Sequence, residues 1–364
     1  MKTLAIFFMI LSGSALFAQS SDYHWFLEEL YFGRQPSPKS ASMGGGFSAY
    51  TENEFGSYYN PALTSLDKGL TINTSFSQGY PGYKGTSYNF LNASYNFKKV
   101  GTFSVSSYNV NYKIVERSWI PEDQNEYLYK NNHTIYTFNY SRDISKDFIA
   151  GININSVQPH YFNPYNSKQY LESLNKSLYS LDAGILIKIP VSKINADVFQ
   201  GVQIGGAFYN ITNSKAYTPA ESYYEPAYYF PLPQIFRLGF SYNINIRKNK
   251  LISNLSLMNL LVHLENESVV NSNRNNEQKI GIEGTLIDLI SVRAGYSSMD
   301  KDNINYGIGL NLPISLLLEK KSPVDISINY ASLKPVPTDN YIEYPEDVTK
   351  YQMLSFKLNW TPGF

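Results

Sequence analysis

The stretch Phe236-Arg-Leu-Gly-Phe-Ser-Tyr-Asn-Ile-Asn-Ile246 alternates between large apolar residues and small or polar ones. Every second position from Phe236 to Ile246 is apolar, whereas the positions between them hold Arg, Gly, Ser and Asn. Successive side chains of a β-strand point to opposite faces of the sheet, so this period of two predicts a strand with one apolar face and one polar face.

The same alternation recurs on both sides of this stretch, from about residue 69 to the end of the chain. It predicts an all-β fold of about 14 strands. The strands are expected to begin near residues 69, 87, 101, 132, 148, 178, 202, 234, 251, 276, 290, 303, 324 and 352.

The composition limits the solvent and the partners of these strands. Charged residues form 16% of the 364 residues, against roughly 25% in ordinary soluble proteins. The 30 basic and 30 acidic residues cancel, which argues against a nucleic-acid partner. The chain has no cysteine, so disulfides and cysteine metal sites are excluded. After residue 20 no apolar run approaches the roughly 18 residues that a membrane-spanning helix needs, which leaves a closed barrel as the membrane architecture.

Connection lengths distinguish the two ends of the predicted barrel. Short connections are expected at residues 98–100, 142–147, 247–250 and 288–289, and long ones at 116–131, 162–177, 213–233, 264–275 and 332–351. Short turns at one end and long loops at the other are typical of outer-membrane β-barrels. We therefore predict a transmembrane antiparallel barrel with extracellular long loops and both termini in the periplasm. The gaps at 191–201 and 313–323 are longer than this rule expects, and a secreted all-β protein is the alternative.

The first residues predict export. Met1 and Lys2 precede an apolar run from Leu4 to Leu16, and Ala18 offers a small residue for cleavage. This layout is that of a secretory signal peptide. The expected organisation is a signal peptide over 1–18, an N-terminal hatch or plug segment over 19–68, and a barrel over 69–364 in the outer membrane.

Residues 21–68 do not alternate, and they contain two short motifs. The first has three successive glycines, which permit positive φ and close approach of another backbone. The second contains Asn-Pro, which favours a turn. A flexible glycine-rich leader is the alternative interpretation. The motif residues are Met43, Gly44, Gly45, Gly46 and Phe47, then Tyr59, Asn60, Pro61 and Ala62.

These two motifs, followed by about 14 strands, resemble the opening of FadL-type fatty-acid transporters. They also resemble the related PorV and PorQ proteins of the Bacteroidota type IX secretion system. The resemblance implies that the N-terminal segment folds into the barrel as a hatch, with Asn60, Pro61 and Ala62 at the junction with the wall. It also implies a kink in the third strand that opens a lateral gap towards the bilayer.

Charged residues within the strands are expected to point into the barrel. A charge on the lipid face costs roughly 2–4 kcal/mol near the bilayer midplane. Because both signs occur, these residues suit a hydrated lumen or contacts with a hatch, and simple solvation is an equally good interpretation. They are Asp182, Lys188, Arg237, Lys279, Glu283, Arg293, Asp325 and Lys357.

The third predicted strand changes phase. Phe103 and Val105 occupy odd positions, whereas the apolar residues from Tyr108 onward occupy even ones. One extra residue is what a β-bulge inserts, so we predict a bulge at Ser106, Ser107 and Tyr108 where the resemblance implies a lateral gate. A misassigned strand register explains the slip equally well.

The loop over residues 217–233 is rich in aromatic residues and proline. Aromatic side chains are effective binding anchors, and proline stiffens the loop that presents them. The loop is predicted to contact a protein partner or to cap the barrel, and packing on itself is the alternative. Its aromatic residues are Tyr217, Tyr223, Tyr224, Tyr228, Tyr229 and Phe230.

No residue pattern indicates catalysis. His24, His133, His160 and His263 lack partners at metal-ligand or catalytic-triad spacing. We therefore expect no enzyme activity, no metal and no cofactor. The favoured hypothesis is a non-enzymatic component of protein secretion or surface assembly, PorV/PorQ-like, with a protein partner and outer-membrane lipid around it. The alternative is a FadL-like passive channel for hydrophobic solutes such as long-chain fatty acids.

Overall fold

A computed structural model describes residues 35–50, 52, 54–78, 87–117, 126–160, 175–195, 198–218, 228–246, 256–271, 275–298, 304–314, 323–333 and 351–361. The predicted signal peptide, Tyr223 and Tyr224 lie outside these ranges.

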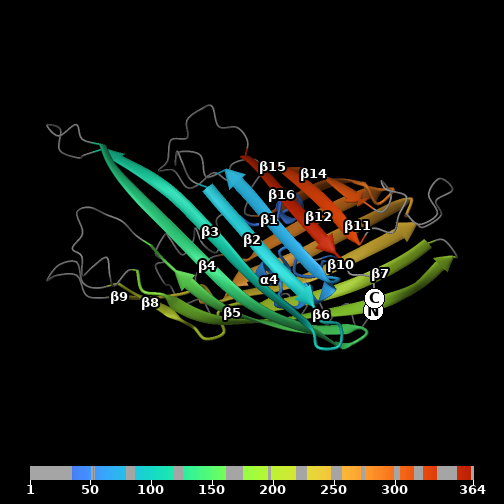
Figure 1. The fold of residues 1–364 in the computed structure, drawn as a ribbon, viewed down its shortest axis with the longest axis horizontal. Helices are drawn as coiled ribbons and strands as arrows, with labels where there is room; N and C mark the ends of the chain where they lie inside the picture. The colour runs from blue at the N-terminus through green and yellow to red at the C-terminus, as the bar shows by residue number, and fades with distance from the viewer. Residues whose placement is uncertain are drawn as a thin grey trace.

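Fourteen strands form one closed antiparallel barrel, which confirms the predicted fold class (Figure 1). The barrel closes where the first strand pairs with the last, Leu70 opposite Trp360. Closure gives each strand a partner on both sides, as a sheet surrounded by lipid requires. The strands are β1 (Leu70–Gln78), β2 (Ser87–Asn96), β3 (Thr102–Arg117), β4 (Glu126–Ser145), β5 (Phe148–Gln158), β6 (Leu178–Asn195), β7 (Val198–Phe208), β10 (Ile235–Ile246), β11 (Met258–Val269), β12 (Glu277–Leu286), β13 (Ile290–Ser297), β14 (Ile304–Pro313), β15 (Val324–Leu333) and β16 (Tyr351–Trp360).

The two ends of the barrel differ in the length of their connections. At one end, β4 and β5 are separated by residues 146–147 and β6 and β7 by residues 196–197. At the other end, residues 159–177, 209–234 and 334–350 connect successive strands. Most residues of the predicted connection 191–201 belong to β6 and β7. This connection is therefore short, in agreement with the expected short turns at this end of the barrel. The connections 247–257 and 314–323 are longer than the other short turns, and β11 begins seven residues later than expected, at Met258 rather than near 251.

Large apolar side chains cover most of the outside of the barrel, where they recur at alternate strand positions. A continuous apolar belt of this kind is unfavourable in water but matches the surface that a transmembrane barrel presents to lipid. The fold is therefore that of a transmembrane β-barrel. Exposed members of the belt include Ile72, Phe76, Leu91, Val105, Phe138, Ile152, Ile154, Leu181, Ile185, Leu264, Ile280, Ile282, Val292, Ile308, Leu310, Leu354, Phe356 and Leu358.

The predicted β-bulge in the third strand is wrong. Ser106 and Ser107 of β3 pair in unbroken register with β2 on one side and β4 on the other. The strand alternates throughout, with Val105 outward and Tyr108 buried inside the barrel. The apolar residues therefore move from the outer face to the inner face partway along β3, and this change, rather than an extra residue, produces the slip in the sequence pattern.

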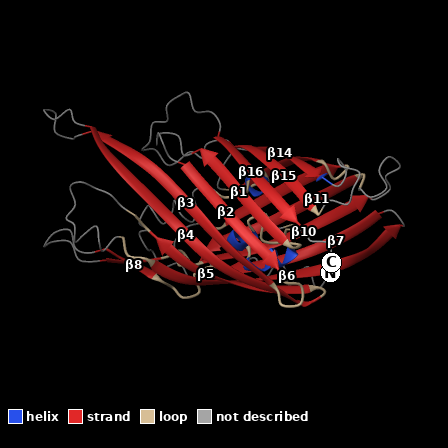
Figure 2. Cartoon of the chain, viewed as in Figure 1, coloured by secondary structure: helices blue, strands red, loops and turns tan. Residues whose placement is uncertain are grey.

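Within the described ranges, three short helices lie inside the barrel (Figure 2). They are α3 (Pro38–Ala41), α4 (Gly56–Tyr59) and the 3-10 helix η2 (Pro61–Leu66). None of the helices in the described ranges is long and apolar enough to cross a membrane. Outside the barrel, β8 (Lys215–Thr218) and β9 (Tyr228–Pro231) form a separate two-stranded ribbon in the connection between β7 and β10.

Candidate functional site

The hatch segment, residues 35–67, is fixed to the barrel wall through Asn60. The Asn60 side chain accepts a hydrogen bond from the Ala62 amide at 3.0 Å, which caps η2 at its start beside Pro61. Its amide nitrogen donates to Ser48 O at 2.7 Å and to Ile185 O of β6 at 2.9 Å. The Asn60-Pro61-Ala62 motif therefore joins the two halves of the hatch segment to the wall.

Glycines on the wall allow the hatch backbone to approach closely. At each of them a Cβ atom would lie closer than 3.0 Å to an atom of the hatch segment. Three pairs are direct cross-strand neighbours: Gly151 with Gly184, Gly205 with Gly239, and Gly281 with Gly295. The contacting glycines are Gly151 (β5), Gly184 (β6), Gly205 (β7), Gly239 (β10), Gly281 (β12), Gly295 (β13) and Gly307 (β14).

The hatch glycines complete this fit. Gly44 and Gly45 have φ of +79° and +86°, a conformation that residues with a Cβ rarely adopt. At β11 the relationship is reversed, because the glycine belongs to the hatch: a Cβ on Gly46 would lie 2.7 Å from the ring of His263. Met43 and Phe47, beside these glycines, are fully buried.

Five of the eight predicted lumen charges are buried against the hatch segment or in the network that holds it. They are Asp182, Arg237, Lys279, Glu283 and Arg293. The other three, Lys188, Asp325 and Lys357, have inward register but lie towards the short-turn end. Of these, Lys357 contacts the hatch segment, with its Nζ 4.0 Å from Asp67 Oδ1.

One ionic cluster centres on β11. Glu265 accepts hydrogen bonds from the backbone amides of Phe47 at 2.9 Å and Ser48 at 2.7 Å. Glu267 pairs with Arg237 at 2.7 Å and with Lys279 at 2.8 Å. Sequence analysis missed both glutamates because it placed them in a predicted loop over 264–275. Their alternation with Leu264 is the signal that could have found them.

A second cluster joins the hatch to β12 and β13. Tyr50 donates to Glu283 at 2.6 Å, and Arg293 also pairs with Glu283. Lys39 lies 3.4 Å from Glu283 and 2.9 Å from Glu52. Burial alone would lower the pKa of Lys39, but these two carboxylates reverse the effect and raise the pKa, so Lys39 stays charged.

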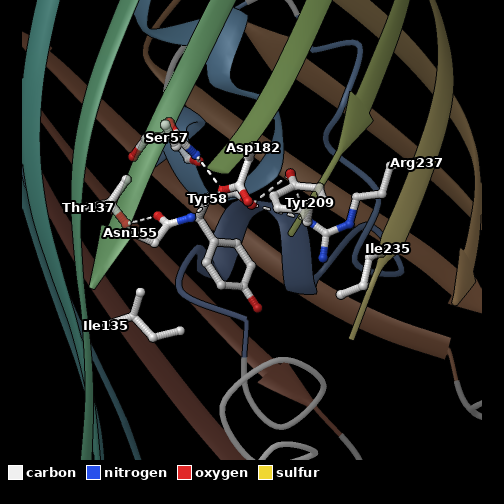
Figure 3. Close-up of a pocket in the computed structure, with 10 residues that line it drawn as sticks. Ser57, Tyr58, Ile135, Thr137, Asn155, Asp182, Tyr209, Ile235 and Arg237 are labelled. Atoms are coloured by element: carbon white, nitrogen blue, oxygen red, sulfur yellow. Dashed lines mark hydrogen bonds between the residues drawn. The ribbon is translucent and has the colours of Figure 1, made fainter. Parts of the chain in front are cut away.

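A small cavity of about 40 Å³ lies between the hatch and the wall (Figure 3). Asp182 on its wall accepts hydrogen bonds from Asn153 at 3.0 Å, Asn155 at 2.7 Å and the Asn210 amide at 2.9 Å. Arg237 donates to Tyr58 O and to the Tyr209 hydroxyl, each at 3.1 Å. The cavity is lined by Ser57, Tyr58, Ile135, Thr137, Asn153, Asn155, Asp182, Tyr209, Ile235 and Arg237.

An inward apolar row runs across the wall on the long-loop side of the hatch. Its members are consecutive cross-strand neighbours on β2 to β6: Phe90, Tyr108, Ile135, Val157 and Leu178. Hatch aromatics pack on this row, with the rings of Phe55 and Phe90 4.6 Å apart and those of Tyr58 and Tyr108 5.6 Å apart. Ile135 belongs both to the row and to the cavity lining.

The outer face beside the apolar row is mixed. Leu91, Tyr136 and Tyr179 are exposed there. Between them, Asn109 donates to Asn132 and to Thr134, each at 2.7 Å. Polar side chains thus enter the outer face at this level, as expected near the end of the membrane-spanning part of the strands.

The predicted partner loop is only partly described. Tyr217 pairs with Tyr229 and Ala216 with Phe230 in the β8–β9 ribbon, and the ribbon belongs to the long-loop end. Tyr228 begins β9.

The histidine side chains in the described ranges do not converge on one site. The His160 amide donates to His133 Nδ1 at 3.3 Å, but the His160 side chain is exposed. His263 is buried on another strand, and His24 lies outside those ranges. No group of three or more His, Asp or Glu side chains in the described parts of the chain is arranged to hold a metal ion.

Comparison with known proteins gives similarity to solved structures only. No family model matches the chain, and no curated protein matches it. The chain is similar to the toluene transporter TodX of Pseudomonas putida, with 8% identity, 91% of this chain and 100% of that chain covered, and a TM-score of 0.49. It is also similar to the toluene transporter TbuX of Ralstonia pickettii, with 9% identity, 91% of this chain and 98% of that chain covered, and a TM-score of 0.42. A Pseudomonas aeruginosa FadL homologue has 12% identity, with 91% of this chain and 99% of that chain covered, and a TM-score of 0.43.

Proposed function

We propose that this protein is a FadL-like passive channel of the outer membrane that admits hydrophobic solutes from the long-loop side. The apolar row is the observation that carries this proposal. Phe90, Tyr108 and Ile135 turn apolar side chains into the barrel, next to inward positions that hold buried polar residues. On this proposal the long loops are extracellular, both termini of the chain lie in the periplasm, and the role is non-enzymatic, without metal or cofactor.

The apolar row offers hydrophobic molecules a binding surface between the hatch and the wall. In the structure this surface is covered, because Phe90 and Tyr108 are buried against the hatch aromatics Phe55 and Tyr58. An apolar solute that takes the place of these rings keeps the row out of water, where exposure would cost about 25 cal/mol per Å². The rings of Phe90 and Tyr108 then offer faces for stacking. The row is thus suited to hold an apolar molecule once the hatch aromatics move aside.

Passage beyond the apolar row requires a rearrangement of the hatch. The cavity of about 40 Å³ is much smaller than the roughly 300–1,000 Å³ of pockets that enclose a whole small-molecule ligand. The hatch and the wall must separate locally before a hydrophobic solute can move on.

The proposal is tested by entry of N-phenyl-1-naphthylamine into Gram-negative cells that express the full chain. Its fluorescence rises when it passes the outer membrane and reaches an apolar environment. We expect Tyr108→Ser to slow this rise several-fold, because the change removes an aromatic ring from the apolar row. Tyr136→Ser is the matched control, since Tyr136 is on the neighbouring strand at nearly the same level but is exposed on the outer face. Equal uptake by cells with wild-type protein, with Tyr108→Ser and without the protein contradicts the channel proposal.

A second proposal, a PorV/PorQ-like component of protein secretion, is favoured by a different observation. In the described ranges the β3 ladder is unbroken at Ser106 and Ser107, and the hatch is held closely against the wall. A sealed barrel suits a protein that presents its loops, with the β8–β9 ribbon among them, to a partner. Cross-linking in the native outer membrane followed by purification tests it. A large, stoichiometric protein partner supports this role, and recovery of the protein alone contradicts it.

A further inference from the structure

Arg237, the cation that lines the cavity beneath the apolar row, already has partners within the protein. Arg237 Nε lies 2.7 Å from Glu267 Oε2, and Nη1 donates to Tyr58 O and to the Tyr209 hydroxyl. The guanidinium carbon also lies 4.7 Å from the centre of the Tyr209 ring. A ligand carboxylate that sought Arg237 would have to compete with Glu267, which is buried beside it. The charge of the arginine is therefore already balanced by Glu267, and two of its three nitrogens, Nε and Nη1, are engaged.

The charge balance around the cavity points the same way. The carboxylates of Asp182, Glu265 and Glu267 outnumber the cations of Arg237 and Lys279 in this buried network. Asp182 lies on the cavity wall itself. A second carboxylate placed next to Asp182 in a region shielded from water is disfavoured by like-charge repulsion and by loss of hydration.

Asp182 has capacity for a neutral donor. Its Oδ2 accepts hydrogen bonds from Asn153 and Asn155, whereas Oδ1 accepts one from the Asn210 amide. A carboxylate oxygen accepts more than one hydrogen bond, so Oδ1 suits a hydroxyl or amide N–H entering the cavity. Figure 3 shows Asp182, Tyr209 and Arg237 along one side of the cavity, with Ile135 away from them.

The dimensions allow only the polar end of a ligand to enter. About 40 Å³ accommodates a hydroxyl group and the atoms next to it. The rest of the molecule would lie on the apolar row in place of the hatch aromatics that cover it, because Ile135 belongs to both features and the Tyr58 ring contacts Tyr108. The arrangement fits an apolar body with one small polar group.

We infer that this site selects neutral hydrophobic molecules that carry a hydrogen-bond donor, such as phenols and alcohols, and rejects carboxylates of the same size. The inference rests on the proposed channel function and specifies its substrate class. It differs from the fatty-acid substrates that the sequence resemblance implies.

Matched naphthalene derivatives test the selectivity. Equilibrium dialysis against the full-length protein in an amphipathic polymer, with the polymer alone as blank, compares 1-naphthol, 1-naphthamide, 1-methoxynaphthalene and 1-naphthoate at pH 7. The first three are neutral at this pH and the last is an anion. We expect 1-naphthol and 1-naphthamide to bind at least about tenfold more tightly than 1-naphthoate. We expect 1-methoxynaphthalene, which has no donor, to bind more weakly than 1-naphthol.

Two variants locate the effect. Asp182→Asn removes the charge but keeps the shape, and should reduce the preference for 1-naphthol over 1-naphthoate to within about threefold. Asp325→Asn removes the same charge from an exposed position at the short-turn end and should leave the preference unchanged. The four-probe comparison with wild-type protein remains decisive if Asp182→Asn fails to fold.

The outcomes separate the inference from the function on which it rests. Equal or tighter binding of 1-naphthoate overturns the selectivity but leaves a channel for hydrophobic solutes in place. An unchanged preference in folded Asp182→Asn also overturns it. If none of the four probes binds the wild-type protein, the channel proposal fails together with the inference.

Discussion

The barrel has two walls that hold the hatch segment by different means. The glycine-rich wall, β5 to β14, contacts the hatch through inward glycines on every strand except β11 and through the buried ionic clusters. The glycine-free wall, formed by β15, β16 and β1 to β4, has no glycine in any of its strands. It holds the hatch mainly through hydrogen bonds of polar side chains and through aromatic contacts with Phe90 and Tyr108. It adds one long ion pair, Lys357 with Asp67. Asn139 donates to Pro61 O at 3.0 Å, and Ser355 donates to Glu54 at 2.5 Å.

This difference indicates which side of the hatch can separate. At the glycine-rich wall, backbone atoms of the hatch segment lie in the space that a Cβ of the wall residue would occupy. Water cannot replace these close packing contacts. At the glycine-free wall, hydrogen bonds can be exchanged for hydrogen bonds to water at a modest net change in free energy. The aromatic contacts with Phe90 and Tyr108 can be replaced by contacts with an apolar solute. If the hatch opens for a solute, we expect it to separate from the glycine-free wall, part of which also carries the apolar row.

The largest effect is expected from Gly205→Val. A side chain there would collide with Ser48 O and with the Ala49 backbone, so the hatch could not seat. We expect the free energy of unfolding to fall by about 3 kcal/mol or more. Urea unfolding in lipid vesicles, followed by tryptophan fluorescence, measures it. Gly206→Val is the matched control, because a Cβ at Gly206 meets only Ile185, at 3.6 Å, and its effect should stay within about 0.5 kcal/mol. Equal effects of the two variants would show that the glycine fit does not seat the hatch.

Glu267→Gln should have the next largest effect. It removes the buried anion shared by Arg237 and Lys279, and loss of one partner from a buried ion pair costs about 3–5 kcal/mol when the other charge remains. Network neighbours such as Glu265 offset part of this, so we expect a value at the lower end of the range. Glu277→Gln provides the control, since Glu277 lies 3.6 Å from Lys279 and is more exposed. The same unfolding measurement applies, and a stability loss no larger than that of the control would contradict the assigned role of the cluster.

The smallest effect is expected at the glycine-free wall. Asn139→Ala removes the hydrogen bond to Pro61 O and leaves this carbonyl to find another donor, at a cost of about 1–3 kcal/mol. Asn109→Ala, on the outer polar face, should change stability by less than about 0.5 kcal/mol. If the hatch separates on this side, Asn139→Ala should also speed entry of N-phenyl-1-naphthylamine. Slower entry in a folded Asn139→Ala protein would argue that the hatch opens elsewhere.

Sequence alternation predicted most strand starts closely because each strand separates lipid from a polar interior along most of its length. The prediction from alternation failed where the strand no longer separates lipid outside from polar groups inside. At Tyr108 the inner face becomes apolar, and the pattern changes phase without any change in backbone pairing. The alternation of apolar and polar residues reflects which environment each face of the strand contacts. An extra residue in a bulge and a change of the apolar residues from the outer to the inner face therefore produce the same one-residue shift in the sequence pattern.

The contents of the hatch site were less predictable. The direction of Arg237 and Lys279 followed from the cost of placing a charge in lipid. Their partner Glu267 was missed because β11 was placed too early in the chain. The glycine pairs such as Gly151 and Gly184 were also missed, since their meaning depends on strand register and on what lies inside the barrel, and neither can be read from one strand alone.

The pairing of β1 with β16 places a demand on the order of assembly. The hatch segment precedes β1, and the strand that completes the ring is the last in the chain. Partners such as Ser355 and Glu54 are 301 residues apart, and such distant contacts make folding slow. A closed barrel leaves little room for a closely fitted hatch segment to enter. We therefore expect the β1–β16 pairing to form last, around a hatch segment that is already inside, so that the N-terminal segment acts as a template for the assembly of the wall.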